Sequence, residues 1–197
     1  GHRFEEIIEI VQGLGSGEPY EFHGRDFDLD SALMRPAATQ PGGIPFLLAS
    51  HYRARSPAQI RRAARLGAGI ISISDTPEEF SQVVQQVAEK AEEFGRDPAS
   101  LEKTFYLTVN MGPDLVKAEA DAVEWLTGYY GSDIWGGRWG PFGGPERVAG
   151  RIADYVAAGA GTIVVRFASF QPEKQLELFL DTVAPAYARS SDWTQNK

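Results

Sequence analysis

Apolar and polar residues alternate along the chain in stretches that predict helices and short buried strands in turn. Residues 3–14 carry apolar side chains at helical spacing and predict a helix. Two short segments, 20–22 and 27–29, flank a polar turn and predict a hairpin. Residues 34–43 hold two prolines and two glycines, which predicts a loop.

Four later runs of apolar and β-branched residues predict the strands of a sheet. They are residues 44–49, 70–73, 104–109 and 162–167. The first run, IPFLLA, is apolar throughout, as expected of a strand that is covered on both faces. Helical patterns separate and follow the strands, at about 57–67, 77–94, 117–130, 145–158 and 172–188. Because strands and helices alternate, we expect an α/β protein with a parallel sheet.

Two segments share one outline and mark the chain as a series of β/α units. Residues 60–74 and 151–169 each consist of an amphipathic run, then Gly-Ala-Gly, then a β-branched stretch. A helix that ends on glycine and continues into a buried strand is the returning half of such a unit. The chain holds three or four units, whereas a closed parallel barrel needs eight.

Composition narrows the class of protein further. The 197 residues include 19 basic and 27 acidic side chains, and the net charge of −8 disfavours nucleic acid or an anionic membrane as the main partner. The absence of cysteine excludes disulfides, a thiolate metal site and a cysteine nucleophile, and it fits a reducing cytoplasm. The apolar runs are too short to span a bilayer, and the N-terminus lacks the pattern of a signal peptide. We therefore expect a cytoplasmic protein without a membrane partner.

The loop at 50–56, SHYRARS, is the clearest candidate site. It joins the end of a predicted strand to a helix that opens with a Ser-Pro pair at 56–57. Ligands of parallel β/α folds bind on that side of the sheet. Free N–H groups at the helix N-terminus favour an anion, and Arg53 and Arg55 add donors suited to phosphate. The alternative is an ordinary solvated loop.

Three further residues each allow two interpretations. Arg166 interrupts an apolar strand near its C-terminal end, so it either faces a ligand or pairs with an acidic neighbour. Asn110 follows a predicted strand and either contacts a ligand or caps the strand in a turn. Of the three histidines only His51 lies in a candidate loop, and no pair has metal-ligand spacing.

The glycine-rich stretch 131–144 predicts a shaped loop. Its Trp135, Arg138, Trp139 and Phe142 either form a lid over an aromatic ligand or pack the loop itself or an interface with another chain. An earlier glycine cluster, GLGSG, follows a helix instead of joining a strand to one, which argues against a dinucleotide-binding loop. The sequence contains no Ser-His-Asp arrangement, Walker motif or HExxH signature.

Seven phrases follow one another along the chain. They are RFEEIIEIVQGLGSGEP, YEFHGRDFDLD, MRPAATQPGGIPFLLAS, SPAQIRRAARLGAGII, TPEEF, EEFGRDPASLEKT and GPFGGPERVAGRIADYVAAGAGTIVVRF. In order and spacing they resemble the bacterial luciferase-like family of flavin- or F420-dependent oxidoreductases and monooxygenases. The resemblance covers nearly the whole chain.

The resemblance implies a TIM-type barrel that binds reduced FMN or F420 at the C-terminal ends of its strands. The residues expected near the cofactor phosphate are Ser50, Arg53, Arg55 and Ser56. Arg166 is expected at the pocket wall. The family usually has a small glycine-rich turn before its Ser-Pro helix start, whereas the turn here carries arginines. Contact by the arginines is therefore expected in place of some backbone contacts.

The resemblance also implies that residues 1–197 are a single half-barrel domain. The first helix resembles the one that follows the fourth strand of the family barrel. The chain then corresponds to the C-terminal half of the barrel, with about four strands, and it ends in a polar tail at 189–197. A half-barrel exposes parallel edge strands and an inner sheet face. Unless the chain is a fragment of a longer enzyme, we expect a homo-oligomer or a complementary N-terminal half-barrel as partner.

The leading hypothesis for function is an oxidoreductase acting on a small organic substrate. The reduced cofactor would exchange a hydride with that substrate, or activate oxygen in the flavin case. No catalytic acid or base is assigned, because the family's candidates would lie largely in the half without a counterpart here. The alternative is a non-catalytic half-barrel that acts as an assembly or ligand-binding module.

Overall fold

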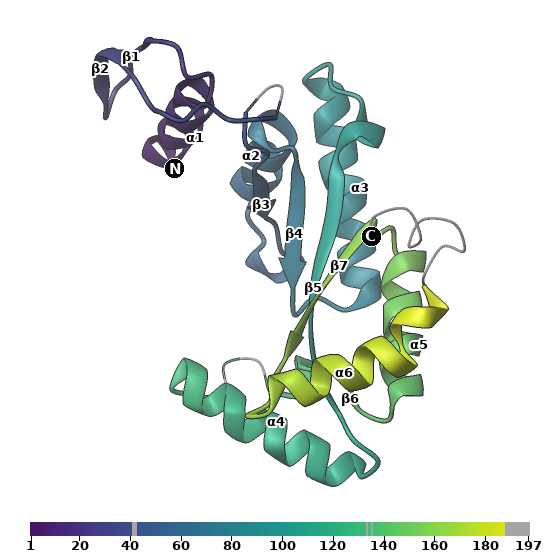
Figure 1. Cartoon of the computed structure of the whole chain (residues 1–197). Helices are drawn as coiled ribbons and strands as arrows, with labels where there is room; N and C mark the ends of the chain where they lie inside the picture. The colour runs from purple at the N-terminus through teal and green to yellow at the C-terminus, as the bar shows by residue number, and fades with distance from the viewer. Residues whose placement is uncertain (41–42, 133, 135, 188–197) are drawn as a thin grey trace. The chain divides into compact units, whose positions relative to one another are not determined.

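The chain folds into two compact units (Figure 1). The computed structural model describes residues 1–40, 43–132, 134 and 136–187. The first unit comprises residues 1–71 and 82–103, and the second comprises 72–81 and the residues from 104 onward. Strand β4 (Gly69–Ile73) and helix α3 (Pro77–Glu93) therefore contribute residues to both units.

The first unit consists of a helix, a hairpin and a β/α return. Its elements besides β4 and α3 are α1 (His2–Leu14), β1 (Tyr20–His23), β2 (Asp28–Ala32), β3 (Leu47–Ala49) and α2 (Pro57–Leu66). Strands β1 and β2 are antiparallel, which confirms the predicted hairpin. Strand β3 runs parallel to β4, with Leu48 opposite Ile70. The order of elements in this unit is the order that the hydrophobic pattern predicts.

Strand β3 is shorter and less covered than its sequence suggests. The apolar run 44–49 predicts a strand covered on both faces, but only three residues form the strand. Leu48 is buried, whereas Leu47 and Ala49, which share the other face, are exposed. The prediction that both faces of this strand are covered was wrong, because apolar side chains do not show which elements pack against each face of a strand.

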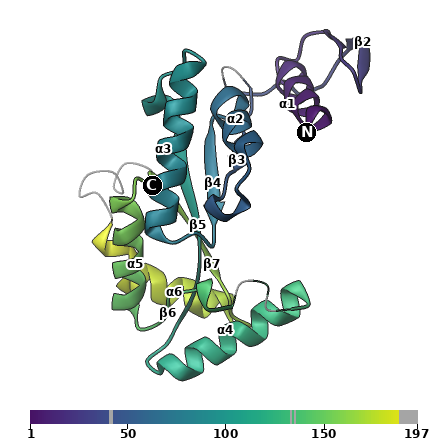
Figure 2. The same ribbon diagram turned by 180° about the vertical axis from the view of Figure 1, so that it is seen from behind.

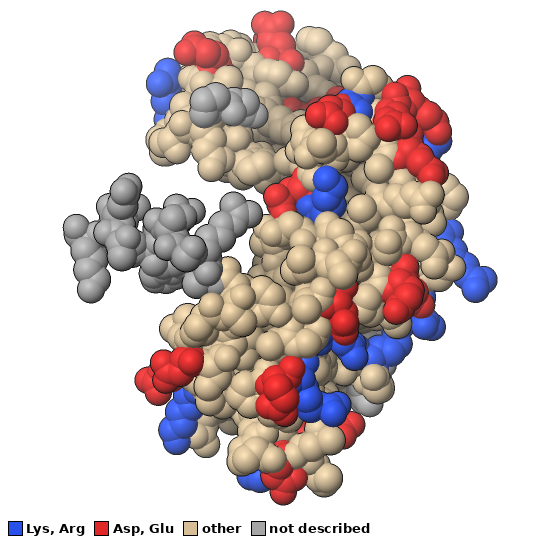
Figure 3. All heavy atoms as spheres, turned by 90° about the vertical axis from the view of Figure 1, so that its right-hand side faces the viewer, with Lys and Arg blue, Asp and Glu red and all other residues tan. Residues whose placement is uncertain are grey.

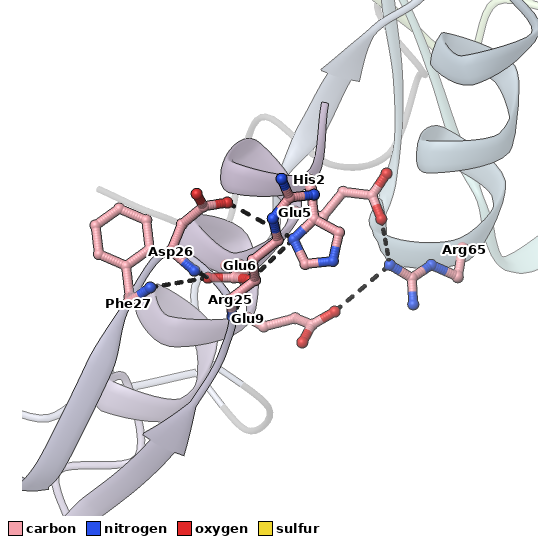
Figure 4. Close-up of polar contacts among 8 residues, drawn as sticks. All are labelled: His2, Glu5, Glu6, Glu9, Arg25, Asp26, Phe27 and Arg65. Atoms are coloured by element: carbon pink, nitrogen blue, oxygen red, sulfur yellow. Dashed lines mark hydrogen bonds and ion pairs between the residues drawn. The ribbon is translucent and has the colours of Figure 1, made fainter.

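The carboxylate of Glu6 fastens α1 to the turn of the hairpin (Figure 4). Glu6 is 4% exposed, and it accepts hydrogen bonds from the N–H groups of Arg25, Asp26 and Phe27 at 2.8, 3.0 and 3.1 Å. His2 Nδ1 lies 2.8 Å from the same carboxylate. Burial opposes ionisation, but the three amides and His2 together hold the pKa of Glu6 below its usual value.

Two further contacts order the first unit. Arg65 on α2 places Nη2 2.7 Å from Glu5 and 3.5 Å from Glu9 of α1 (Figure 4). At Gly69, a Cβ atom would lie 2.1 Å from the carbonyl oxygen of Glu102. The Gly-Ala-Gly signature therefore marks a return where two backbones approach too closely for a side chain.

The second unit is built around strand β5, which spans Glu102–Met111 and enters this unit at Thr104. The other elements are α4 (Leu115–Tyr130), β6 (Phe142–Gly143), α5 (Pro145–Ala157), β7 (Thr162–Phe167) and α6 (Pro172–Thr182). Strand β5 pairs in parallel with both β6 and β7. Figure 2 shows β5 and β7 side by side, and their register places Thr108 opposite Arg166.

Three aromatic rings form the centre of this second unit. Phe80, Phe105 and Tyr155 are each at most 3% exposed. The ring of Tyr155 stacks on Phe105 with centroids 3.6 Å apart, and Phe80 meets Phe105 edge-on at 5.4 Å. The Tyr155 hydroxyl donates a hydrogen bond of 2.6 Å to the backbone carbonyl of Asp75. The same residues thus bury apolar area and fix the segment that follows β4.

Two boundaries in the second unit differ from the prediction. The last helix ends at Thr182 instead of 188, and a separate 3₁₀ turn at Ala184–Ala186 follows it. Pro185 stands in that turn, where its ring is incompatible with a continuing α-helix. The stretch 131–144, predicted as loop alone, contains the short strand β6. The predicted tail at 189–197 lies outside the described residues.

Charged side chains of both signs are interspersed on the face drawn in Figure 3, where no large area carries one sign alone. Within the described ranges, every helix is too short or too polar to cross a membrane.

Candidate functional site

The loop after β3 turns its first candidate residue inward. Ser50 is fully buried, and its N–H donates to the carbonyl of Ile71 at 3.1 Å. Its hydroxyl oxygen lies 3.5 Å from the carbonyl of Leu48 in the preceding strand. Ser50 therefore continues the pairing of β3 with β4, and its side chain is not presented at the surface.

The loop then forms a short 3₁₀ turn, Tyr52–Ala54, before α2 begins. Arg55 follows this turn in the left-handed conformation, with φ of 45°, and Ser56 occupies the N-cap position of α2. The Ser56 side chain makes no capping hydrogen bond, and Pro57 is the first helical residue. The N-terminal turn of α2 is thus left without a side-chain cap. Pro57 has no N–H and the Gln59 N–H donates to the Ser56 carbonyl at 3.0 Å, so the Ala58 N–H is the donor of this turn that an anion could use.

A cavity of about 480 Å³ lies beside this helix start in the first unit. It is lined by residues of the loop, of the first turn of α2 and of α3: His51, Tyr52, Arg55, Ser56, Pro57, Ile60, Gln86, Glu89, Lys90 and Glu93. The structure therefore brings Arg55, Ser56 and His51 together. Ser50 and Arg53 do not line this cavity, and Arg53 is exposed.

The charges around this cavity are unequally compensated. Lys90 pairs with Glu93, with Nζ 2.6 Å from the carboxylate. Glu89 accepts a hydrogen bond from Gln85 at 2.9 Å. Among the described residues, Arg55 makes no side-chain hydrogen bond or ion pair. Its guanidinium is consequently the cation in the loop that is best placed to take an external anion.

Arg166 lies in the second unit and has partners of an unexpected kind. Its Nε and Nη2 donate to the Thr108 hydroxyl at 3.2 and 2.9 Å, and its Nη1 donates to the Tyr130 hydroxyl at 2.8 Å. Of the two interpretations of Arg166, the pairing with an acidic neighbour is not seen, because no ion pair to Arg166 occurs among the described residues. Hydroxyl groups and aromatic rings surround the guanidinium instead.

Asn110 belongs to β5 itself and does not cap a turn after it. The side chain is 4% exposed, and Nδ2 donates to the carbonyl of Ala168 at 2.8 Å. This bond joins the end of β5 to the residue after β7. The Asn110 side chain therefore links the ends of the two strands.

A second cavity, of about 320 Å³, lies within the second unit. Its lining includes three arginines (Arg138, Arg147 and Arg151). The Arg138 side chain donates to the Ser74 carbonyl at 2.6 Å, and Ser72 Oγ donates to the Asp75 carboxylate at 2.6 Å. The sequence gives no sign that Asp75 belongs to a site, because only the fold brings the turn that contains Asp75 close to Arg138.

The glycine-rich stretch packs mainly against its own unit. Trp139 and Phe142 are each 8% exposed and belong to a buried cluster with residues of α4. Such burial favours the packing interpretation of these side chains over an open lid. Trp135, which belongs to the same predicted group, lies outside the described residues.

Comparison with known proteins gives one family match and several relatives. The model of a family described as luciferase-like monooxygenase matches residues 1–140. An uncharacterised protein of Mycobacterium tuberculosis is 40% identical over 96 residues, which are 49% of this chain and 31% of that protein. The F420-dependent glucose-6-phosphate dehydrogenase of Mycobacterium leprae is 22% identical over 210 residues, covering 95% of this chain and 61% of that enzyme.

A solved structure supports the fold. The coenzyme F420 dependent tetrahydromethanopterin reductase from Methanopyrus kandleri superposes with a TM-score of 0.74 at 19% identity, covering 95% of this chain and 63% of that one. The predicted class, α/β with parallel strands of the TIM-barrel type, is confirmed. The chain spans less than two-thirds of the length of each of these proteins.

Proposed function

Because the chain belongs to the luciferase-like monooxygenase family, we propose that it forms the phosphate-binding part of a flavin- or F420-dependent oxidoreductase. The observation that carries the proposal is the uncapped start of α2 beside the cavity of about 480 Å³. Arg55 supplies a guanidinium that makes no hydrogen bond or ion pair within the described chain, and Ser56 supplies a hydroxyl that does not cap the helix. Uncapped donors, a guanidinium and a hydroxyl are the groups that a phosphate monoester or diester requires.

The cofactor would supply the redox chemistry, and this chain would supply binding and orientation. When bound, the reduced cofactor donates a hydride to an organic substrate or, in the flavin case, activates oxygen. Arg55 and Ser56 hold the phosphate, while His51 and Tyr52 line the cavity beside it. The Mycobacterium leprae and Methanopyrus kandleri relatives are named for F420, so F420 is tested beside FMN.

The exposed faces of the sheet strands support a partner for this chain. Leu47 in the first unit is 36% exposed, and Val164 on β7 in the second unit is 38% exposed. Parallel strands normally have both faces covered. A complementary N-terminal half-barrel or a second copy of the chain is proposed to cover these faces. Light scattering of the purified chain tests this, since a stable monomer would contradict it.

The phosphate site is tested by pairs of ligands with and without the phosphate. FMN and riboflavin differ in the phosphate alone, whereas F420 and its deazaflavin alcohol differ in the phosphate and in the tail that the phosphate carries. Each ligand is titrated by fluorescence. The native chain is expected to bind the phosphorylated member more tightly. Arg55→Ala should weaken binding of the phosphorylated ligand about 10-fold. The double variant Arg53→Ala/Arg55→Ala should weaken it about 30-fold, which corresponds to about 2 kcal/mol.

Two controls separate the phosphate site from general effects of charge. The side chain of Arg25 is exposed in the hairpin turn, so Arg25→Ala removes one positive charge at a remote place. It should leave all four affinities unchanged. An affinity for FMN and F420 that survives the double substitution would overturn the role of the loop. If the assembled protein binds neither cofactor, the alternative of a non-catalytic half-barrel module is favoured instead.

A further inference from the structure

Helix α3 forms part of the wall of the cavity beside Arg55. The side chains that it contributes recur every three or four residues: Gln86, Glu89, Lys90 and Glu93. This spacing places them on one side of the helix. The rest of the lining comes from the loop after β3 and from α2, and all of these residues belong to the first unit. A guanidinium of the loop and two carboxylates of α3 therefore share one cavity.

The two carboxylates of α3 differ in how their charges are compensated. Both oxygens of Glu93 accept hydrogen bonds from Lys90 Nζ, at 2.8 and 2.6 Å, so these two charges cancel locally. The partner of Glu89 is neutral, because Oε1 of Glu89 accepts from Gln85 Nε2 at 2.9 Å. In the part of the chain that the structure describes, Glu89 forms no ion pair. The α3 side of the cavity thus carries one uncompensated negative charge.

The cavity has room for more than the phosphate of a ligand. Its volume of about 480 Å³ lies in the range of small-molecule sites and far exceeds that of a single phosphate group. A chemical group attached to a phosphate at Arg55 therefore shares the cavity with Glu89. The charge of that attached group then decides whether α3 attracts or repels it.

Glu89 acts differently on charged and uncharged groups. Coulomb repulsion between two like charges about 6 Å apart in water corresponds to about a 3-fold loss of affinity. Several carboxylates on one ligand add further repulsion. A hydroxyl group is not repelled, and it can donate a hydrogen bond to Oε2 of Glu89, which Gln85 does not use.

We propose that Glu89 is a specificity-determining residue, which selects against phosphate esters that carry several further carboxylates. This inference rests on the proposed function, because it takes a phosphate at Arg55 as the anchor. Each glutamate of the F420 tail adds a carboxylate, whereas the chain between the ring and the phosphate of FMN carries hydroxyl groups. FMN, and F420 without its glutamates, are therefore the ligands that suit this cavity, and F420 with a long glutamate tail is disfavoured.

Two forms of F420 isolate the effect of the tail. The glutamate-free form and a form with five glutamates share the ring and the phosphodiester, and they differ in the number of carboxylates. Each form is titrated into the full chain and followed by deazaflavin fluorescence. At about 10 mM salt we expect the native chain to bind the glutamate-free form about 5-fold more tightly. The ratio of the two affinities should fall to about 1 at about 1 M salt, where the Debye length is about 3 Å.

Two substitutions on α3 assign this preference to one residue. Glu89→Gln removes the charge and keeps the shape of the side chain, and it should lower the ratio at low salt from about 5 to about 2. Glu92 is exposed on the same helix and does not line the cavity. Glu92→Gln changes the net charge by the same amount, so it is the matched control and should leave the ratio at its native value.

The outcomes separate this inference from the proposed function. A ratio near 1 in the native chain at low salt would overturn the role of Glu89, and so would a ratio that Glu89→Gln leaves unchanged. An equal effect of Glu92→Gln would show a general effect of helix charge and would also overturn it. In each of these cases the phosphate site stands as long as FMN binds more tightly than riboflavin. If no phosphorylated ligand binds, the proposed function and this inference fail together.

Discussion

Replacing Tyr155 by phenylalanine removes one hydroxyl group from the core of the second unit. The residue is 3% exposed, and its hydroxyl donates to the Asp75 carbonyl at 2.6 Å. Its ring stacks on Phe105 with centroids 3.6 Å apart. Phenylalanine keeps that ring, so the substitution isolates the hydrogen bond from the packing.

The expected loss of stability at neutral pH follows from the burial of this bond. A typical intramolecular hydrogen bond contributes about 1 kcal/mol net, and removing one partner of a buried bond costs about 1–3 kcal/mol. We expect Tyr155→Phe to lower the free energy of unfolding by about 1–2 kcal/mol. For a protein of this size the melting temperature should fall by roughly 2–4 °C per kcal/mol.

The pH dependence gives a second and independent signature. Burial, opposed in part by Arg151, raises the pKa of Tyr155 to about 12. The unfolded chain loses the phenol proton near pH 10, whereas the folded chain retains it up to about pH 12. The stabilisation is therefore complete below about pH 10 and is lost as the pH rises through 12, by on the order of 2 kcal/mol. The phenylalanine variant lacks this loss, so the two proteins should converge in stability at high pH.

Urea unfolding of both proteins at a series of pH values between about 7 and 11 measures the difference. Tyr129→Phe removes a hydroxyl from a residue that is 65% exposed and serves as the matched control. The reasoning is refuted if Tyr155→Phe is as stable as the native chain at pH 7. It is also refuted if the difference between the two proteins stays constant up to pH 11.

Three further substitutions test the local structure. Glu6→Gln should reduce the stability of the fold at neutral pH and weaken the dependence of stability on acid pH. Because the pKa of Glu6 is lowered in the folded chain, its stabilisation is present above about pH 4 and is lost on acidification. Thermal melts at a series of pH values measure this. Gly69→Ala should destabilise by about 3 kcal/mol or more in urea unfolding, because its Cβ would meet the Glu102 carbonyl at 2.1 Å. Thr76→Ala breaks a reciprocal cap with Glu79, in which each side chain accepts from the other's N–H, and should cost about 1 kcal/mol.

The boundaries that the sequence predicts well are those with a local chemical cause. Strand β7 spans Thr162–Phe167, as predicted, because Gly-Ala-Gly stops the helix before it. Helix α2 begins at Pro57 after Ser56, as its Ser-Pro pair indicates. The end of α6 differs from the prediction because the helical pattern of side chains continues past Thr182, whereas Pro185 is incompatible with a continuing α-helix.

The candidate sites also differ in whether they follow from local sequence or from long-range pairing. Arg55 and Ser56 are adjacent in the chain, so their shared place at the start of α2 follows from local pattern. The aromatic surroundings of Arg166 do not. The rings within reach of its guanidinium span positions 106 to 139, and they meet at Arg166 only because β5 and β7 pair in a register that places Thr108 opposite it. A register between distant strands has no signal in a single sequence.

The incorrect prediction for β3 is itself informative about assembly. An apolar strand in a parallel sheet is stable when both faces are covered, and IPFLLA has the composition of such a strand. Yet Leu47 and Ala49 are exposed in the first unit, and Val164 is exposed in the second. Exposed apolar side chains on sheet strands favour association over solvation, at roughly 25 cal/mol for each Å² covered. Within the described residues these side chains lack a cover, and covering them is the role proposed for a complementary half-barrel or a second copy of the chain.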